Sequence, residues 1–365
     1  MSRANESQLF VSFVTHGRND DYLGNSRWRL EMCLNSLALA CEELGELENV
    51  EVLVTDWGSE VPLSQVLRLL PAARRITRLV YVPPQLAARL QKDSDYPVTL
   101  AMNATIRRAR GLFILRMDQD AFFLPLDLTR LFDVLRGTSP QLNLDPCRAM
   151  FTTIRRHIPL KVVQHEPGLD AYRCKVRRYG RLMVYPPLGK PYHHGAVLDV
   201  MHRDIWHETR GYDESMLYMA YMDVDLNARV SLRYPLVDLS GFGIYSYHSE
   251  HEVPRDSQVR RENTFCLRQC VAVNGEDWGL AAYELPTQCA ALTISQDERS
   301  GRALPDWYAL YALCDLLLRS AYTISFVQRS FGRQFIYLVK QPASRWPYIL
   351  ARAVIRRCRI SWRDE

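Results

Sequence analysis

The sequence lacks the marks of several common protein classes. Its nine cysteines include no Cys-x-x-Cys pair, and none has a histidine partner at zinc-ligand spacing, which argues against a disulfide framework and a zinc finger. No internal repeat and no low-complexity tract is present. The first residues, MSRANESQLF, lack the charged region and apolar run of a signal peptide. We therefore expect reduced, mostly buried thiols and a cytoplasmic protein.

Long apolar runs are also missing. The longest covers residues 307–318 and contains Asp315, so it is about a third shorter than a membrane-spanning helix requires. Hydrophobic residues make up 47% of the chain and charged residues 24%, which indicates neither a disordered nor a membrane-spanning class. The net charge of +5 suits an anionic ligand or an acidic membrane surface. It does not single out nucleic acid, and we expect no such partner.

Strand-like and helix-like segments alternate in the first part of the chain. Runs rich in β-branched and aromatic residues are predicted to be strands at 9–15, 50–55, 78–82 and 112–115. Apolar residues at helical spacing predict helices at 27–47 and 100–110. This alternation favours an α/β fold with a largely parallel sheet. The length of 365 residues allows two domains, or one enlarged α/β domain with an appendage.

The most informative stretch is LFILRMDQDAFF at 112–123, where a strand-like run ends in Asp118-Gln119-Asp120. Two carboxylates this close together need a cationic partner if they are even half-buried, either a divalent metal or Arg and Lys side chains. Ligands gather at the carboxyl ends of strands in open α/β sheets, so this Asp-x-Asp motif could orient a metal-bound diphosphate. A loop with solvated aspartates is the alternative interpretation.

Further acidic and histidine residues follow later in the chain. Asp223 and Asp225 are expected at the start of a helix, and His248 and His251 follow a strand-like run at 243–247. With Asp120 they would form one site for sugar transfer from a nucleotide diphosphate, in which a metal stabilises the departing diphosphate and a carboxylate takes the proton of the acceptor hydroxyl. Alternatively, the aspartates stabilise the helix dipole at the surface and the histidines are ordinary hydrogen-bonded residues.

Five motifs occur in an order that resembles GT-A fold glycosyltransferases of the family 2 type, over about residues 8–255. They are DWGS at 56–59, Asn103 with Gly111, DQD at 118–120, RGYDE at 210–214, and MDVDLNAR at 222–229. The resemblance implies a GT-A, Rossmann-like fold with a mixed, mainly parallel sheet flanked by helices. It also implies a nucleotide-sugar donor, UDP-sugar being favoured, and Mn²⁺ or Mg²⁺ as cofactor. The acceptor it favours is a glycan, a polysaccharide or a lipid-linked glycan.

The resemblance also implies roles for individual residues. Those expected to bind the nucleotide sugar are Thr15, His16, Arg18, Asp56, Asn103, Arg116, Asp118 and Asp120. Within this set, Asp56 would bind the base edge, and Asp118 and Asp120 would hold ribose and metal. His248 would be a further metal ligand. The residues expected at the acceptor are Gly195, Asp213, Glu214 and Trp278. Trp278 lies in a predicted turn and is either an exposed sugar-stacking lid or a packing residue.

Asp223 aligns with the catalytic base of an inverting, single-displacement transfer. Met222 replaces the acidic residue that precedes this base in the family, so Asp225 remains a second candidate. A retaining transferase and a nucleotide-sugar-binding protein without catalysis are alternatives. A nucleotidyltransferase is another, although it would be expected to carry a Gly-rich phosphate loop after the first strand, and this loop has a single glycine, Gly17.

The predicted organisation has three parts. Residues 8–255 form the catalytic domain, with a nucleotide-sugar half at 8–125 and an acceptor half at 126–255; residues 256–300 pack on it as a mixed segment. Residues 301–365 are a basic, amphipathic helical extension. This extension could contact an anionic membrane peripherally, dock on the catalytic domain, or bind a partner enzyme of glycan assembly.

Overall fold

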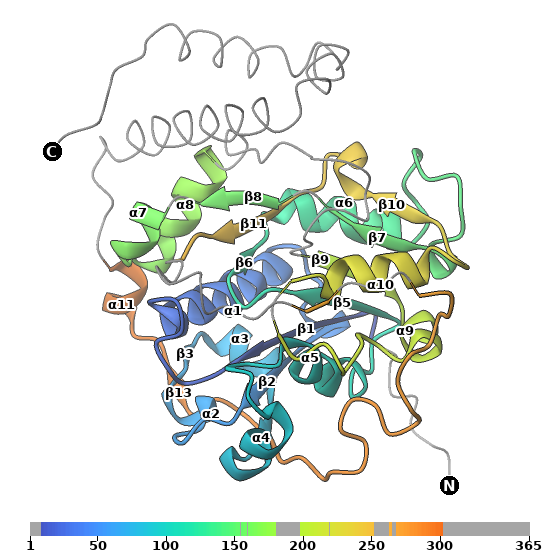
Figure 1. The fold of residues 1–365 in the computed structure, drawn as a ribbon. Coiled ribbons are helices and arrows are strands. Elements are labelled where there is room, and N and C mark those ends of the chain that lie inside the picture. The colour runs from blue at the N-terminus through green and yellow to red at the C-terminus, as the bar shows by residue number, and fades with distance from the viewer. Residues whose placement is uncertain are drawn as a thin grey trace, which may run out of the picture.

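The structure is a computed structural model that describes residues 9–153, 155–158, 160–179, 198–218, 220–251, 263–264 and 268–301. Within these residues eight strands form the main sheet (Figure 1). In spatial order they are β10 (Leu236–Asp238), β7 (Met150–Thr152), β9 (Leu198–His202), β5 (Phe113–Met117), β1 (Val11–Gly17), β2 (Val50–Trp57), β4 (Thr77–Val82) and β12 (Thr287–Gln288). Two small sheets consist of β6 (Ala121–Phe122), β11 (Ser246–Ser249) and β8 (Arg155–Ile158), and of β13 (Leu292–Thr293) and β3 (Arg68–Leu69).

Most neighbours in the main sheet are parallel. β1 pairs in parallel with β2 and β5, β2 with β4, and β7 with β10. β9 runs antiparallel to β5 and β7, and β12 runs antiparallel to β4. The expected α/β fold with a mixed, mainly parallel sheet flanked by helices is therefore confirmed.

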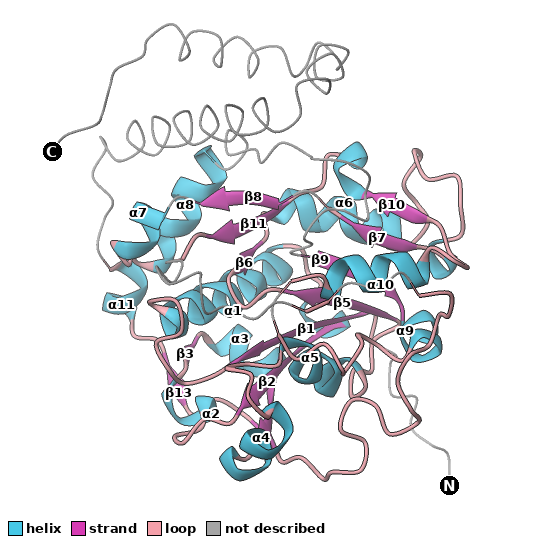
Figure 2. Cartoon of the chain, in the orientation of Figure 1, coloured by secondary structure: helices cyan, strands magenta, loops and turns pink. Residues whose placement is uncertain are grey.

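Helices cover both faces of this sheet (Figure 2). They are α1 (Ser26–Glu43), α2 (Leu63–Val66), α3 (Pro71–Ile76), α4 (Pro84–Gln91), α5 (Val98–Ile106), α6 (Pro125–Leu135), α7 (Leu160–Gln164), α8 (Leu169–Tyr179), α9 (Arg203–Thr209), α10 (Met222–Val230) and α11 (Gln296–Ser300). Val11 and Phe13 of β1 face a core shared with α1, α3 and α6, whereas Val14 faces a core shared with α4, α5, α9 and α10. This alternation follows from the two-residue period of a strand.

The chain order creates a switch point beside β1. From β1 the chain builds β2 and β4 on one side of the sheet and then returns to place β5 on the other side. In open α/β sheets the loops diverge at such a point, and ligands bind in the crevice at the carboxyl ends of the strands. The carboxyl ends of β1 and β5 are Gly17 and Met117.

Several element boundaries differ from those expected. The helix expected to reach residue 47 ends at Glu43, because Gly45 adopts a left-handed backbone with φ +69°. The strand expected at 243–247 begins only at Ser246, since a turn through Gly243 at φ +70° precedes it. His248 therefore lies inside β11 rather than after it.

The segment after the expected catalytic domain contributes to the sheets. β12 adds to the edge of the main sheet beside β4, and β13 pairs with β3. Residues 302–365 of the C-terminal extension expected at 301–365 lie outside the described residues, as does Gly195. None of the helices in the described ranges is both long and apolar enough to cross a membrane.

Candidate active site

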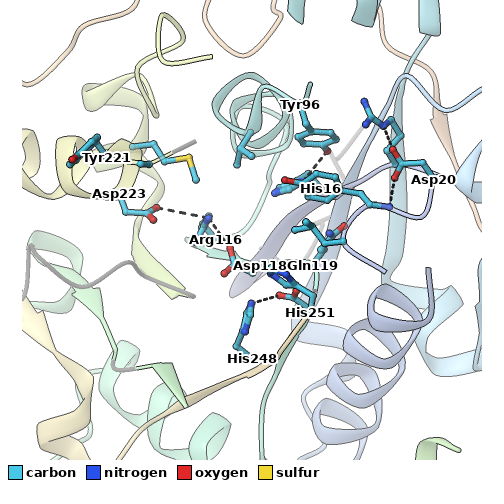
Figure 3. Close-up of a pocket in the computed structure, with 17 residues that line it drawn as sticks. His16, Asp20, Tyr96, Arg116, Asp118, Gln119, Tyr221, Asp223, His248 and His251 are labelled. Atoms are coloured by element: carbon cyan, nitrogen blue, oxygen red, sulfur yellow. Dashed lines mark hydrogen bonds and ion pairs between the residues drawn. The ribbon is translucent and has the colours of Figure 1, made fainter. Parts of the chain in front are cut away.

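A cavity of about 270 Å³ opens at the carboxyl ends of β1 and β5 (Figure 3). Five segments supply its walls: β1 with its following loop, the region around α5, the β5–β6 turn, the start of α10, and β11 with the residue two beyond its end. Its lining includes His16, Arg18, Asp20, Tyr22, Leu23, Tyr96, Arg116, Asp118, Gln119, Asp120, Tyr221, Met222, Asp223, His248 and His251. The structure thus brings the Asp-x-Asp motif, the later Asp223 and both histidines to one place.

Arg116 lies between two of the carboxylates, as Figure 3 shows. Its Nη2 atom is 2.8 Å from Oδ1 of Asp118 and 3.9 Å from Oδ1 of Asp223, and the residue is only 2% exposed. Burial disfavours the charged guanidinium, but the surrounding anions, Asp118 foremost, outweigh this and raise the pKa of Arg116 well above its usual value. Arg116 is therefore a fixed positive charge at the floor of the cavity.

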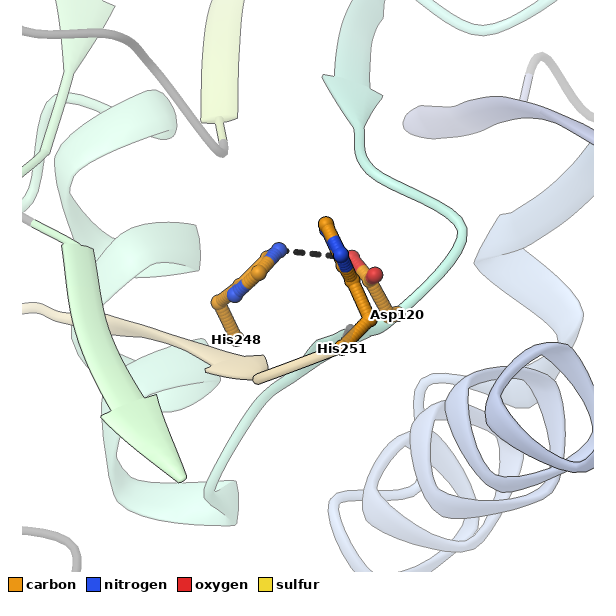
Figure 4. A group of neighbouring side chains, drawn as sticks. All are labelled: Asp120, His248 and His251. Atoms are coloured by element: carbon orange, nitrogen blue, oxygen red, sulfur yellow. Dashed lines mark ion pairs between the residues drawn. The ribbon is translucent and has the colours of Figure 1, made fainter. Parts of the chain in front are cut away.

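Asp120 forms a compact group with the two histidines (Figure 4). Its Oδ1 atom is 3.3 Å from Nε2 of His248, and one ligand atom from each of Asp120, His248 and His251 lies within 4.8 Å of the others. A carboxylate with two imidazoles suits a transition metal such as Mn²⁺ better than Mg²⁺, which prefers oxygen ligands. Asp118, also predicted as a metal ligand, lines the cavity but lies outside this group, which includes His251; its metal role stays a prediction.

The other end of the cavity is aromatic. Nδ1 of His16 is 2.9 Å from the hydroxyl of Tyr96, and the Arg18 guanidinium lies 5.3 Å from the centre of the Tyr96 ring. Burial, with a smaller contribution from Arg116, lowers the pKa of His16 to about 4, so this imidazole is neutral at pH 7. His16 and Arg18 thus reach the cavity as predicted for nucleotide binding, whereas Thr15 is fully buried in β1.

Asp56 and Asn103 hydrogen-bond to neighbouring segments and do not line the cavity. Asp56 is fully buried at the end of β2, where it accepts hydrogen bonds from the Ser59 hydroxyl and, at 2.7 Å, from the backbone N–H of Leu63. Asn103 donates its amide to the backbone oxygen of Tyr212 at 2.8 Å and accepts from the N–H of the same residue at 2.8 Å. The base contact of Asp56 and the donor contact of Asn103 stay predictions.

The buried Asp56 makes protein stability depend on pH. Burial raises its pKa to about 6, and the hydrogen bonds from Ser59 and Leu63 offset this only in part. The folded protein binds the proton of the Asp56 carboxyl more tightly than the unfolded chain does. The stabilisation of the fold by this proton is therefore complete below about pH 4 and is lost as the pH rises through 6. It amounts to about 3 kcal/mol at most. Urea unfolding at pH 4 to 7 should show this component in the wild type and lack it in Asp56→Asn. Parallel pH profiles for the two proteins would contradict the assignment.

The two candidate bases occupy different environments. The Asp223 side chain is 13% exposed and lines the cavity. Asp225 is buried, does not line the cavity, and its Oδ2 atom accepts from Nε of Arg229 at 2.7 Å. Arg229 in turn donates to the backbone oxygens of Thr209, Gly211 and Val271. Asp223 therefore faces the cavity, whereas Asp225 belongs to a buried ion pair.

Of the residues expected at the acceptor, Asp213, Glu214 and Trp278 do not line this cavity, and Gly195 lies outside the described residues. Oε1 of Glu214 accepts from the backbone N–H of Gly279 at 2.7 Å and from the Asn103 amide at 3.0 Å, and Asp213 forms an ion pair with Arg268. Trp278 is 3% exposed and packs in the core, with the Arg107 guanidinium 5.2 Å from its ring centre. The expectation of an exposed Trp278 is therefore wrong, because hydrogen bonds to Glu214 and Arg107 hold this turn against α5.

The sequence motifs missed some residues in and around the cavity. Tyr96 and Tyr221 line it and belong to no motif. Arg29 lies behind the lining as the partner of Asp120, with Nη1 2.5 Å from Oδ2. Arg29 could have been noticed in the sequence as a charged residue between Trp28 and Leu30, on the apolar face of a predicted helix. Asp199 on β9 is fully buried and accepts from the Tyr212 hydroxyl at 2.8 Å; burial and then the charge of Asp223 raise its pKa above the usual range.

Comparison with known proteins gives only distant structural similarities. No protein-family model and no curated protein matches the chain. Among solved structures, it is similar to a crystal structure of S. aureus TarS 1–349, with 12% identity and a TM-score of 0.43 over 66% of this chain and 60% of that chain. It is also similar to the mannosyltransferase PcManGT from Pyrobaculum calidifontis in complex with GDP-Man and Mn²⁺, with 13% identity and a TM-score of 0.40 over 94% and 86% of the two chains. At these values the activity must be inferred from this chain's own residues.

Proposed function

We propose that this chain is a metal-dependent glycosyltransferase. It moves a sugar from a nucleotide-diphosphate sugar, UDP-sugar being favoured, to a hydroxyl of a glycan, polysaccharide or lipid-linked acceptor, with inversion at the anomeric carbon. The observation that carries the proposal is the single cavity that holds the Asp120, His248 and His251 group together with Asp223. The order of sequence motifs that resembles the GT-A family supports it independently.

Each end of the cavity has a part in this reaction. Asp120, His248 and His251 would hold Mn²⁺, which when bound supplies positive charge to the departing diphosphate. The aromatic end around His16 and Tyr96 suits the flat base of the nucleotide. Because His16 is neutral at pH 7, it can hydrogen-bond a nucleotide without adding charge.

Asp223 would act as the base. Its carboxylate takes the proton of the acceptor hydroxyl while that oxygen bonds to the anomeric carbon and the bond from this carbon to the phosphate oxygen breaks. The electron pair of the broken bond leaves with the diphosphate. Arg116, 3.9 Å from Asp223 and 2.8 Å from Asp118, fixes both carboxylates with respect to each other. A carboxylate near the reacting carbon also stabilises an oxocarbenium-like transition state.

Calorimetric titration against UDP-, GDP-, TDP- and CMP-sugars tests this proposal. With Mn²⁺ present, we expect one nucleotide class to bind, UDP being favoured, and EDTA to weaken that binding on the order of 100-fold, because Asp120, His248 and His251 would hold a metal that supplies positive charge to the diphosphate. Mg²⁺ should replace Mn²⁺ poorly, since two of the three ligands are imidazoles. A folded protein that binds none of these nucleotides would contradict the transferase proposal.

A further inference from the structure

Arg29 connects the Asp120 group to the loop that forms one wall of the cavity. It lies on α1, is 1% exposed, and uses all three guanidinium nitrogens. Nη1 is 2.5 Å from Oδ2 of Asp120, Nη2 donates to the backbone oxygen of Tyr22 at 2.8 Å, and Nε donates to that of Gly24 at 3.1 Å. One planar group thus binds the carboxylate and two backbone carbonyls at once.

The loop at 20–25 has a backbone that needs such support. Leu23, Gly24 and Asn25 are consecutive left-handed residues, with φ of 60°, 74° and 53°. For a residue with a side chain this conformation costs roughly 1 kcal/mol, and it persists where the surroundings impose it. Arg29 binds the carbonyls on either side of Leu23, and Leu23 lines the cavity with Tyr22. Arg29 therefore helps to hold this wall, together with hydrogen bonds that Asp20 and Asp21 accept within the loop.

The same guanidinium orients Asp120. With Oδ2 bound to Arg29, the other oxygen, Oδ1, faces Nε2 of His248 at 3.3 Å. Asp120 is 3% exposed, so the carboxylate has little freedom to turn toward water. Groups that bind a metal-ligating carboxylate from behind fix its orientation and typically contribute 10- to 100-fold, by order of magnitude, to metal affinity.

We propose that Arg29 is a positioning residue that couples metal binding at Asp120 to the shape of the loop at 20–25. A metal that fixes Oδ1 restrains the whole carboxylate, which restrains Arg29 and, through it, the carbonyls of Tyr22 and Gly24. Metal binding would thereby set the shape of the loop that forms this wall of the cavity. This inference rests on the proposed function in one respect, that Asp120 is a metal ligand.

Hydrogen exchange of the wild-type protein with Mn²⁺ alone tests the coupling without donor or acceptor. When Mn²⁺ is bound, backbone amides in the peptide over 20–25 should exchange more slowly, by about threefold at most. This slowing is expected although none of these residues belongs to the Asp120 group. A peptide over α6, which contributes no residue to the cavity lining, should be unaffected. Free Mn²⁺, measured by electron paramagnetic resonance, reports occupancy in the same samples.

Arg29→Lys separates orientation from charge. Lysine keeps the positive charge, but a single ammonium cannot reproduce the fork that binds three acceptors. We expect the affinity for Mn²⁺ alone to fall about tenfold. When more Mn²⁺ restores occupancy, the slowing at 20–25 should still be absent. Arg27→Lys is the matched control, because Arg27 is exposed on the same helix; this variant should behave like the wild type.

The outcomes separate this inference from the proposed function. If the wild type binds Mn²⁺ without slower hydrogen exchange at 20–25, the coupling is contradicted and the proposed metal site is still supported. An Arg29→Lys protein that melts at a lower temperature but keeps the Mn²⁺-dependent slowing shows a purely structural arginine, which also overturns it. Absence of Mn²⁺ binding by the folded wild type removes both. Should Arg29→Lys fail to fold, the wild-type exchange measurement decides alone.

Discussion

Asp223→Asn is expected to lower the rate of transfer about 10³-fold while donor binding with Mn²⁺ stays within about twofold of the wild type. Asparagine has the shape of aspartate and can remain beside Arg116, but it cannot take a proton from a hydroxyl. The slow hydrolysis of the bound donor, with water as acceptor, measures this loss without knowledge of the natural acceptor. Calorimetry on the same samples measures donor binding.

Asp225→Asn is the matched control, two residues further on the same helix. Asp225 is buried against Arg229, so this variant should lower the melting temperature and leave the hydrolysis rate of the folded fraction near that of the wild type. If Asp225→Asn silences a folded protein and Asp223→Asn does not, Asp225 is the base. If the wild type binds donor but neither hydrolyses nor transfers it, the protein binds the donor without catalysis. The presence of Met222, where the family has an acidic residue, would then be the sequence feature that fits this result.

Asp120→Asn is expected to lower the affinity for Mn²⁺ on the order of 100-fold or more, and to reduce donor binding to the level seen with EDTA. The substitution removes the only carboxylate from the group of three ligands but keeps an oxygen that can accept from Arg29. Titration with Mn²⁺ alone, followed by titration with the donor, measures the two effects separately. Wild-type Mn²⁺ affinity in Asp120→Asn would place the metal elsewhere.

Asp120→Ala should cost more stability than the asparagine variant. Both remove the charge partner of the Arg29 guanidinium, which is 1% exposed, but alanine also removes the oxygen that accepts its hydrogen bond. Removing one partner of a buried ion pair typically costs about 3–5 kcal/mol. We therefore expect a clear loss of stability in urea unfolding for Asp120→Ala and a smaller one for Asp120→Asn. Equal stability of the two variants would contradict the role given to the Arg29 pair.

The order of elements and the location of the key carboxylates could be predicted from the sequence. β-branched runs and helical spacing are local signals, so they identified β1, β2, β4 and β5 and the helices α1 and α5 between them, but not α2, α3 and α4. The Asp-x-Asp motif follows directly after β5, and parallel strands bring their carboxyl ends to one edge. For this reason Asp118 and Asp120 could be expected at the ligand-binding edge of the sheet. Asp223 and His248 were grouped with them because their side chains suit the same metal-dependent chemistry.

Which polar residues face the cavity was decided only by the tertiary structure. Asp223 and Asp225 look equivalent in the sequence. In the structure, Asp225 forms an ion pair with the buried Arg229, whereas Asp223 lines the cavity. Arg29 and Asp120 are 91 residues apart, and no local period encodes their ion pair. Burial and ion pairing depend on which distant segments pack together, whereas strand and helix patterns depend on near neighbours. The sequence by itself therefore determined the central parallel strands of the sheet and its acidic edge, and packing determined the partner of each charge.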